Sequence, residues 1–157
     1  MYRNRTCATL SLISALFVLA SCGVSEVDGL RAFESVEQAL GTGSDFPTQC
    51  RAGGTIRYEP PFTGGASYEN TATFSSCAEY PASGSIEAWI FDGTVKVKRV
   101  LVGDHYETSY VGDVSFYQGL EADCHIDMKR GPATGGGIER NWGTACDQEI
   151  DFTEHSF

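Results

Sequence analysis

Apolar residues follow three different patterns along the chain, and each pattern predicts a different element. An unbroken apolar run extends from Leu10 to Ala20. Residues 29–41 then place apolar side chains three and four positions apart, which is the period of an amphipathic helix. From Thr55 onward apolar and polar residues alternate in short stretches, which is typical of half-buried strands. The pattern therefore predicts one helix followed by strands.

The helical segment reads GLRAFESVEQALG, with Asp28 before it as a candidate N-cap and Gly41 as its end. A helix of about three turns is marginal alone, so we expect its apolar stripe to pack on the domain. That stripe consists of Leu30, Phe33, Val36 and Leu40. The residues before it, 22–29, are predicted to form a tether.

The later part of the chain alternates between strand patterns and turn signals. The clearest strand is LEADCHIDMK, residues 120–129, whose apolar residues and Cys124 share one face. Residues 130–137 are expected to form a flexible loop. Turn signals occur at Asp92-Gly93, Gly103-Asp104, Gly112-Asp113 and Gln118-Gly119.

These signals predict about eight to ten short strands in an antiparallel meander. No alternation of strand and helix appears, so parallel architectures are excluded. The predicted fold class is mainly β, with one short N-terminal amphipathic helix. A sandwich and an up-and-down barrel both fit the pattern. Residues 30–157 are expected to form a single β-rich domain.

The first apolar run has the features of an export signal. Arg3 and Arg5 precede it, and its eleven residues are fewer than the roughly 20 that a membrane-spanning helix needs. Leu19, Ala20 and Ser21 lead directly into Cys22. This string resembles the lipobox of bacterial lipoproteins, although a plain secretory signal with a spare cysteine is the alternative.

The resemblance implies that residues 1–21 are a signal peptide and that Cys22 is acylated and anchors the chain in membrane lipid. Two or three acyl chains, such as palmitate, hold a protein durably where one chain binds marginally. The implied location is the bacterial cell envelope, outside the cytoplasm. Gly23 follows the cysteine, which favours the outer membrane if the bacterium is Gram-negative.

The charge balance excludes one class of partner. Removing residues 1–21 removes Arg3 and Arg5 and no acidic residue, which changes the net charge from −10 to −12. Such an acidic chain repels phosphate backbones, so nucleic acid is not an expected partner.

Four cysteines remain after Cys7 leaves with the signal and Cys22 takes lipid. In an oxidising compartment four thiols predict two disulfides, with three possible connectivities. No Cys-x-x-Cys pair occurs among them, which argues against a zinc or redox centre. Closure between sequence neighbours is weakly favoured, because neighbouring strands in a meander lie side by side. The favoured pairs are Cys50 with Cys77 and Cys124 with Cys146.

One strand face gathers charged side chains that could suggest a metal site. Same-face neighbours stand about 6.5 to 7 Å apart, whereas metal ligands approach an ion to about 2.0 to 2.6 Å. We therefore interpret the face as an exposed charged surface, with a divalent-cation site completed by a neighbouring strand as the weaker alternative. Its residues are Glu121, Asp123, His125 and Asp127.

No catalytic motif and no cofactor signature is found. Ser83-Gly84-Ser85 lacks the spacing of a nucleophile elbow, and no lysine follows the glycines at 135–137 as a phosphate loop requires. The abundant aromatic residues are interpreted as packing rather than as a binding surface. The expected function is a non-enzymatic envelope module that binds a protein, polysaccharide or lipid, or that occupies the surface. The alternative is a lipid-anchored hydrolase with dispersed catalytic carboxylates.

Overall fold

A computed structural model describes residues 23–41, 47–60, 66–82, 86–132 and 139–154. It contains one helix, α1 (Glu26–Leu40), and seven strands. The strands are β1 (Thr55–Glu59), β2 (Tyr68–Glu79), β3 (Trp89–Val102), β4 (His105–Gln118), β5 (Ala122–Pro132), β6 (Glu139–Ala145) and β7 (Gln148–Glu154).

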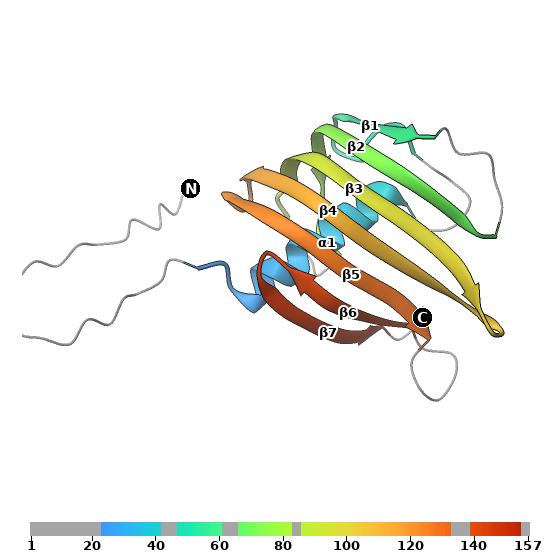
Figure 1. Ribbon diagram of the computed structural model, residues 1–157. Coiled ribbons are helices and arrows are strands. Elements are labelled where there is room, and N and C mark those ends of the chain that lie inside the picture. The colour runs from blue at the N-terminus through green and yellow to red at the C-terminus, as the bar shows by residue number, and fades with distance from the viewer. Residues whose placement is uncertain (1–22, 42–46, 61–65, 83–85, 133–138, 155–157) are drawn as a thin grey trace, which may run out of the picture.

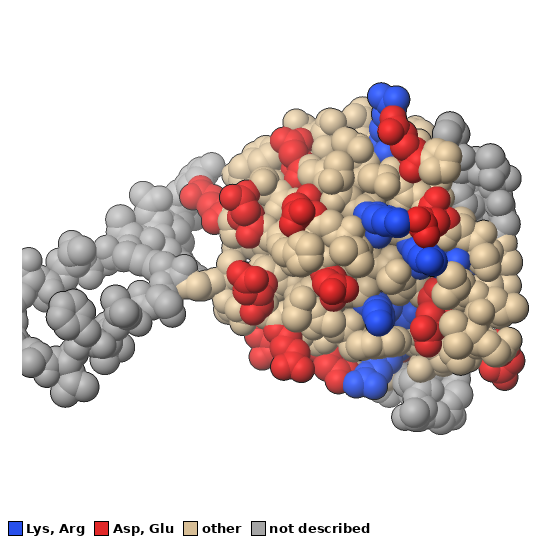
Figure 2. Space-filling model, in the orientation of Figure 1, with Lys and Arg blue, Asp and Glu red and all other residues tan. Residues whose placement is uncertain are grey.

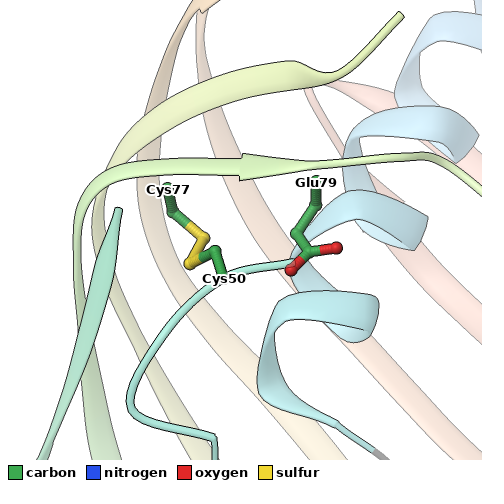
Figure 3. A group of neighbouring side chains, drawn as sticks. All are labelled: Cys50, Cys77 and Glu79. Atoms are coloured by element: carbon green, nitrogen blue, oxygen red, sulfur yellow. A yellow bond between two sulfur atoms is a disulfide. The ribbon is translucent and has the colours of Figure 1, made fainter. Parts of the chain in front are cut away.

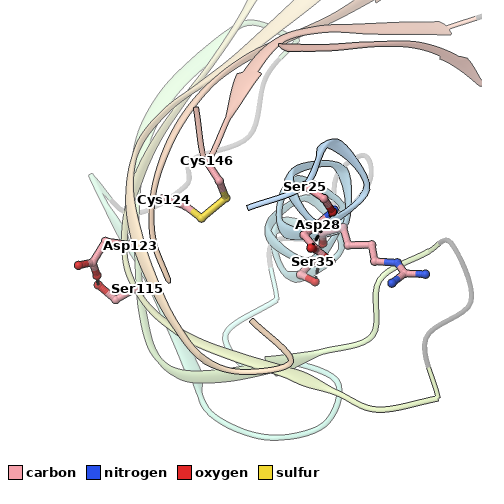
Figure 4. The surroundings of a disulfide bond; sticks show 8 residues. Ser25, Asp28, Ser35, Ser115, Asp123, Cys124 and Cys146 are labelled. Carbon is pink, nitrogen blue, oxygen red and sulfur yellow. Dashed lines mark hydrogen bonds between the residues drawn. A yellow bond between two sulfur atoms is a disulfide. The ribbon is translucent and has the colours of Figure 1, made fainter. Parts of the chain in front are cut away.

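The strands form one antiparallel sheet in the order in which they occur in the sequence. The predicted mainly β meander with one N-terminal helix is therefore confirmed. The arrangement is neither of the two that the pattern left open: in the described part of the chain there is no second sheet, and β1 does not pair with β7. Instead the open sheet curves around α1, which lies against its concave face (Figures 1 and 4).

The helix begins earlier than the periodicity predicted. Ser25, not Asp28, is the N-cap, and its hydroxyl oxygen accepts a hydrogen bond from the Asp28 backbone N–H at 3.2 Å. The helix thus begins at Glu26, inside the segment predicted as a tether. Serine caps well because its short side chain reaches the unpaired N–H groups of the first turn. Gly41 ends the helix as predicted, with its N–H donating to Glu37 and Gln38.

Two predicted turns are wrong, because Asp92-Gly93 and Gly112-Asp113 lie within strands β3 and β4. A Cβ on Gly93 would approach the Asp113 carbonyl oxygen to 2.3 Å, and a Cβ on Gly112 would approach the Thr94 oxygen to 2.0 Å. These glycines are needed where neighbouring strands come close, and not for chain reversal. Because the chain continues without a turn at these two places, β3 and β4 each join two of the predicted strands. This explains why the sheet has seven strands and not the predicted eight to ten.

The chain reverses near Gly103 and Gly119, as predicted. The loop predicted for residues 130–137 is wrong for Arg130–Pro132, which belong to β5 because they pair with β6, and the rest of that segment lies outside the described residues. The inward face of β5 carries Cys124, Ile126 and Met128, all buried as the alternation predicted.

The core lies between α1 and the concave face of the sheet. Val36 and Leu40 of the helix are buried, and Phe33 meets the Tyr110 ring edge to face at 5.4 Å. Edge-to-face pairs stabilise beyond the area they bury. A second aromatic group consists of Phe74, Trp89, Phe91 and Phe116.

Candidate functional site

A row of six side chains crosses the concave face near the end that carries the β3–β4 hairpin. Its members are successive register partners on six adjacent strands, so they form one continuous line. We call this line the inner row. Its residues are Tyr68, Arg99, Thr108, Arg130, Asn141 and Phe152.

The strand pattern directs these polar residues inward. Arg99 is in phase with the buried Val95 and Val97, and Arg130 is in phase with Ile126 and Met128. Because side chains two apart share a face, both arginines point to the side of the sheet that the helix occupies. Except for the fully buried Asn141, the inner row is partly buried and retains contact with solvent.

Arg130 forms ion pairs with carboxylates from two other elements. Its Nη1 donates to Glu37 Oε1 of α1 at 2.5 Å, and its Nε donates to Glu139 Oε2 at 2.7 Å. Burial alone would lower the pKa of this guanidinium, but the two carboxylates outweigh it and the pKa is raised. Glu37 also accepts a hydrogen bond from the Tyr110 hydroxyl at 3.4 Å. This cluster therefore joins the helix to the sheet.

Arg99 has a different environment. Its guanidinium carbon lies 4.5 Å from the centroid of the Tyr106 ring, and it forms a side-chain hydrogen bond with the Tyr68 oxygen. Its Nε is buried and has no hydrogen-bond partner among the described residues. No ion pair with a carboxylate is found for Arg99 in the described part of the chain.

The tyrosines beside Arg99 stay protonated near neutral pH. Burial raises the pKa of Tyr58, and the nearby Tyr68 raises it further. Burial also raises the pKa of Tyr68, although the Arg99 guanidinium opposes that change. Each hydroxyl therefore remains a neutral donor and acceptor.

Asn141 is fully buried, yet neither its amide nitrogen nor its amide oxygen has a hydrogen-bond partner in the described residues. Such groups usually bind protein, water or ligand atoms, because burying them without a partner costs about 1–3 kcal/mol. Along the inner row, the Asn141 amide and the Arg99 Nε lie on opposite sides of Arg130, and neither has a hydrogen-bond partner among the described residues.

The charged face predicted on residues 121–127 lies on the convex side, away from the inner row. Glu121, Asp123, His125 and Asp127 are all exposed. His125 Nδ1 lies 2.7 Å from Asp113 Oδ1 of β4, and the Ser115 hydroxyl donates to Asp123 at 2.5 Å. Figure 4 shows that pair on the opposite side of the sheet from α1. Each contact is thus with β4 and not among the four residues.

Carboxylates and cations are unevenly distributed on this convex face. Figure 2 shows carboxylates alone over one end and Lys and Arg interspersed with carboxylates over the other. At the mixed end Lys96 pairs with Glu69 at 2.5 Å and Arg140 pairs with Asp151 at 2.5 Å. Such exposed pairs contribute little to stability.

Disulfides join Cys50 to Cys77 and Cys124 to Cys146, the connectivity that sequence-local closure favoured. The Glu79 carboxylate lies beside the first bond (Figure 3), and three potential ligand atoms there lie within 4.8 Å of one another. Both sulfurs are in the disulfide, so neither is a thiolate that could bind a metal. Glu79 Oε1 instead accepts a hydrogen bond from the Arg51 N–H at 2.5 Å.

The two disulfides indicate an oxidising, extracytoplasmic compartment. Cys22 and the rest of the predicted lipobox lie outside the described residues. Among the residues described, no helix has the length and apolar character to span a bilayer.

No protein-family model, curated protein or solved structure matches this chain. The sequence analysis missed Arg99, Thr108 and Arg130. A signal was present, because both arginines interrupt the apolar phase of a strand, but only the register places them in one row.

Proposed function

We propose that this chain is a lipid-anchored protein of the bacterial envelope whose β domain is a non-enzymatic binding module. The observation that carries the binding role is the inner row, in which partly buried tyrosine, arginine and threonine side chains converge on one part of the concave face. Ligand sites commonly combine apolar or aromatic walls with a few well-placed polar groups.

The anchoring part of the proposal depends on the lipobox resemblance at residues 19–22 and agrees with an extracytoplasmic domain that contains disulfides. Gly23 after the acylated Cys22 favours the outer membrane in a Gram-negative bacterium. Residues 23–25 are then all that separates the lipid from the start of α1, so the domain sits close to the bilayer.

The alternative, a hydrolase with catalytic carboxylates, needs a carboxylate that exchanges a proton during the reaction. Two carboxylates that contact the inner row, Glu37 and Glu139, both bind the Arg130 guanidinium. These ion pairs occupy oxygens of both carboxylates. This arrangement supports binding rather than the hydrolase alternative.

The anchoring is tested by replacing Cys22 with Ala. Cells that express the parent should incorporate labelled palmitate into the protein, and the protein should sediment with membranes. The variant should do neither. Continued fatty-acid labelling of the variant would show that Cys22 is not the acylated residue.

The binding role is tested with a compound panel that covers sugars, sugar acids, sugar phosphates, amino acids, peptides and fatty acids. Compounds that raise the melting temperature of the parent should lose this effect in Thr108→Phe, which fills the inner row. Thr144→Phe, on the exposed outer face of β6, should keep it. A panel without stabilising compounds, or equal stabilisation of both variants, would contradict a site at the inner row.

A further inference from the structure

We infer that the inner row binds a small ligand that carries an oxyanion, either a carboxylate or a phosphate, next to a planar or sugar ring, and that Arg99 holds the oxyanion. The inference rests on the proposed function and adds the class of ligand and the residue that selects it.

The first observation is the charge environment of Arg99. Arg57, Arg130 and Arg140 each bind a carboxylate, whereas Arg99, like Arg31 and Arg51, has no ion pair with a carboxylate among the described residues. The chain has 21 acidic residues and 11 basic ones, so carboxylate partners are abundant overall. A partly buried arginine without one leaves a positive centre on the concave face, and an anion from outside the chain complements it.

The second observation is the geometry of the guanidinium. Its carbon lies over the Tyr106 ring, 4.5 Å from the centroid, so the ring fixes the position of the cation. An arginine edge binds carboxylate or phosphate oxygens through two parallel hydrogen bonds. The Nε has no acceptor in the described residues, so the hydrogen-bonding capacity of this guanidinium is not used up by its bond to Tyr68.

The third observation concerns the neighbours of Arg99. Thr108 is its register partner on β4, and Tyr68 is its register partner on β2. Two hydroxyl-bearing residues therefore flank Arg99 on the neighbouring strands, whose backbones lie about 5 Å from that of β3. Tyr58 lies near Tyr68, close enough for the two phenols to affect each other's charge. These phenol rings offer flat surfaces against which a sugar or planar ring packs.

The fourth observation is the position of the site relative to the proposed anchor. α1 begins beside the β6–β7 turn, where a Cβ on Gly29 would meet the Ala145 oxygen at 2.7 Å. The β3–β4 hairpin, which is next to Arg99, extends toward the opposite end of the molecule (Figure 1). The inner row is therefore far from the N-terminal end of α1, which favours a ligand that approaches from the side away from the membrane over a lipid of the same bilayer.

The test uses the full chain in a non-ionic detergent, with nitrogen-15 in the arginine side chains and three probes. Glucose 6-phosphate and glucuronate carry a ring and an oxyanion, and glucose carries the ring alone. The two anionic probes should shift the Arg99 Nε–H resonance and bind at least about tenfold more tightly than glucose. The tighter of the two identifies the oxyanion as phosphate or carboxylate.

Two variants assign the effect. Arg99→Gln should remove the preference for the anionic probes. Arg140→Gln is the matched control, because the Arg140 guanidinium also lies near an aromatic ring, 5.7 Å from the centroid of Trp142. Arg140 is on the outer face of the sheet, so this variant should retain the preference. The resonance in the parent protein remains informative even if Arg99→Gln does not fold.

Equal affinities for glucose and both anions, or an unshifted Arg99 resonance, would overturn the oxyanion inference. The proposed function would survive that result if a neutral compound from the panel still lost its effect in Thr108→Phe. It would fail only if no compound depended on the inner row.

Discussion

Arg130 of β5 binds Glu37 of α1 with 2.5 Å between Nη1 and Oε1, and the two side chains are only 19% and 8% exposed. This ion pair links the helix to the sheet on the concave face, where water screens charges poorly. Glu139, which is half exposed, binds the same guanidinium from β6.

Replacing Glu37 with Leu should therefore lower the free energy of unfolding by about 2 to 4 kcal/mol, because it leaves a partly buried guanidinium with one carboxylate instead of two. Denaturant unfolding measures this change. Glu69→Gln, which breaks exposed pairs with Lys96 and Lys98, is the control and should change stability much less. Equal effects of the two variants would mean that the Arg130 pair does not hold the helix.

Alkaline pH should destabilise the domain through its buried tyrosines. Burial, reinforced by the Glu37 charge, raises the pKa of Tyr110 above its ordinary value of 10.0. Above about pH 10 the unfolded chain loses the Tyr110 proton while the folded chain keeps it. The contribution of Tyr110 to the free energy of unfolding is therefore fully present below about pH 10 and is lost as the pH rises further.

The decline in melting temperature between pH 9 and pH 11 should be shallower in Tyr110→Phe than in the parent. Tyr117→Phe, at a side chain that is 46% exposed, should follow the parent curve. Identical slopes for all three proteins would contradict a stabilising role for the neutral phenol of Tyr110.

Gly112 is required by the approach of β3 to β4 rather than by a turn. A Cβ there would lie 2.0 Å from the Thr94 carbonyl oxygen, so Gly112→Ala should force the strands apart and cost about 2 to 4 kcal/mol. Gly103, in the β3–β4 turn, has φ of +66° and nothing near its Cβ position. Gly103→Asn should cost less than about 1 kcal/mol, because asparagine tolerates that conformation. Chemical denaturation compares the two, and a larger loss at Gly103 would refute this explanation.

The exposed carboxylates of β5 should be nearly neutral for folding. Asp123→Asn combined with Asp127→Asn should change the free energy of unfolding by no more than about 0.5 kcal/mol per site, as is usual for surface substitutions. Millimolar calcium or zinc should shift the melting temperature of the parent very little. A rise of several degrees in the parent that is absent from the double variant would instead identify a bound cation, because a specific ligand stabilises by about 2.7 kcal/mol at a hundredfold excess over its dissociation constant.

Local patterns in the sequence determined the class of structure. Alternation over residues 120–129 predicted which side of β5 faces the core, and it also directed Cys124 toward Cys146, which lies on the same side of the sheet as α1 (Figure 4). The apolar stripe around Phe33 predicted the packed helix. These features follow from periodicity within a single element, which a linear chain displays directly.

Only the tertiary structure decided where the chain does not turn and which residues meet. Gly93 and Gly103 each stand beside an aspartate and were both predicted as turns, yet Gly93 lies within a strand, where the Asp113 carbonyl of β4 approaches it. Arg99 and Arg130 flank Thr108 only through the registers of β3, β4 and β5. A contact between strands depends on how the whole sheet curves and pairs, and no spacing within one strand encodes it.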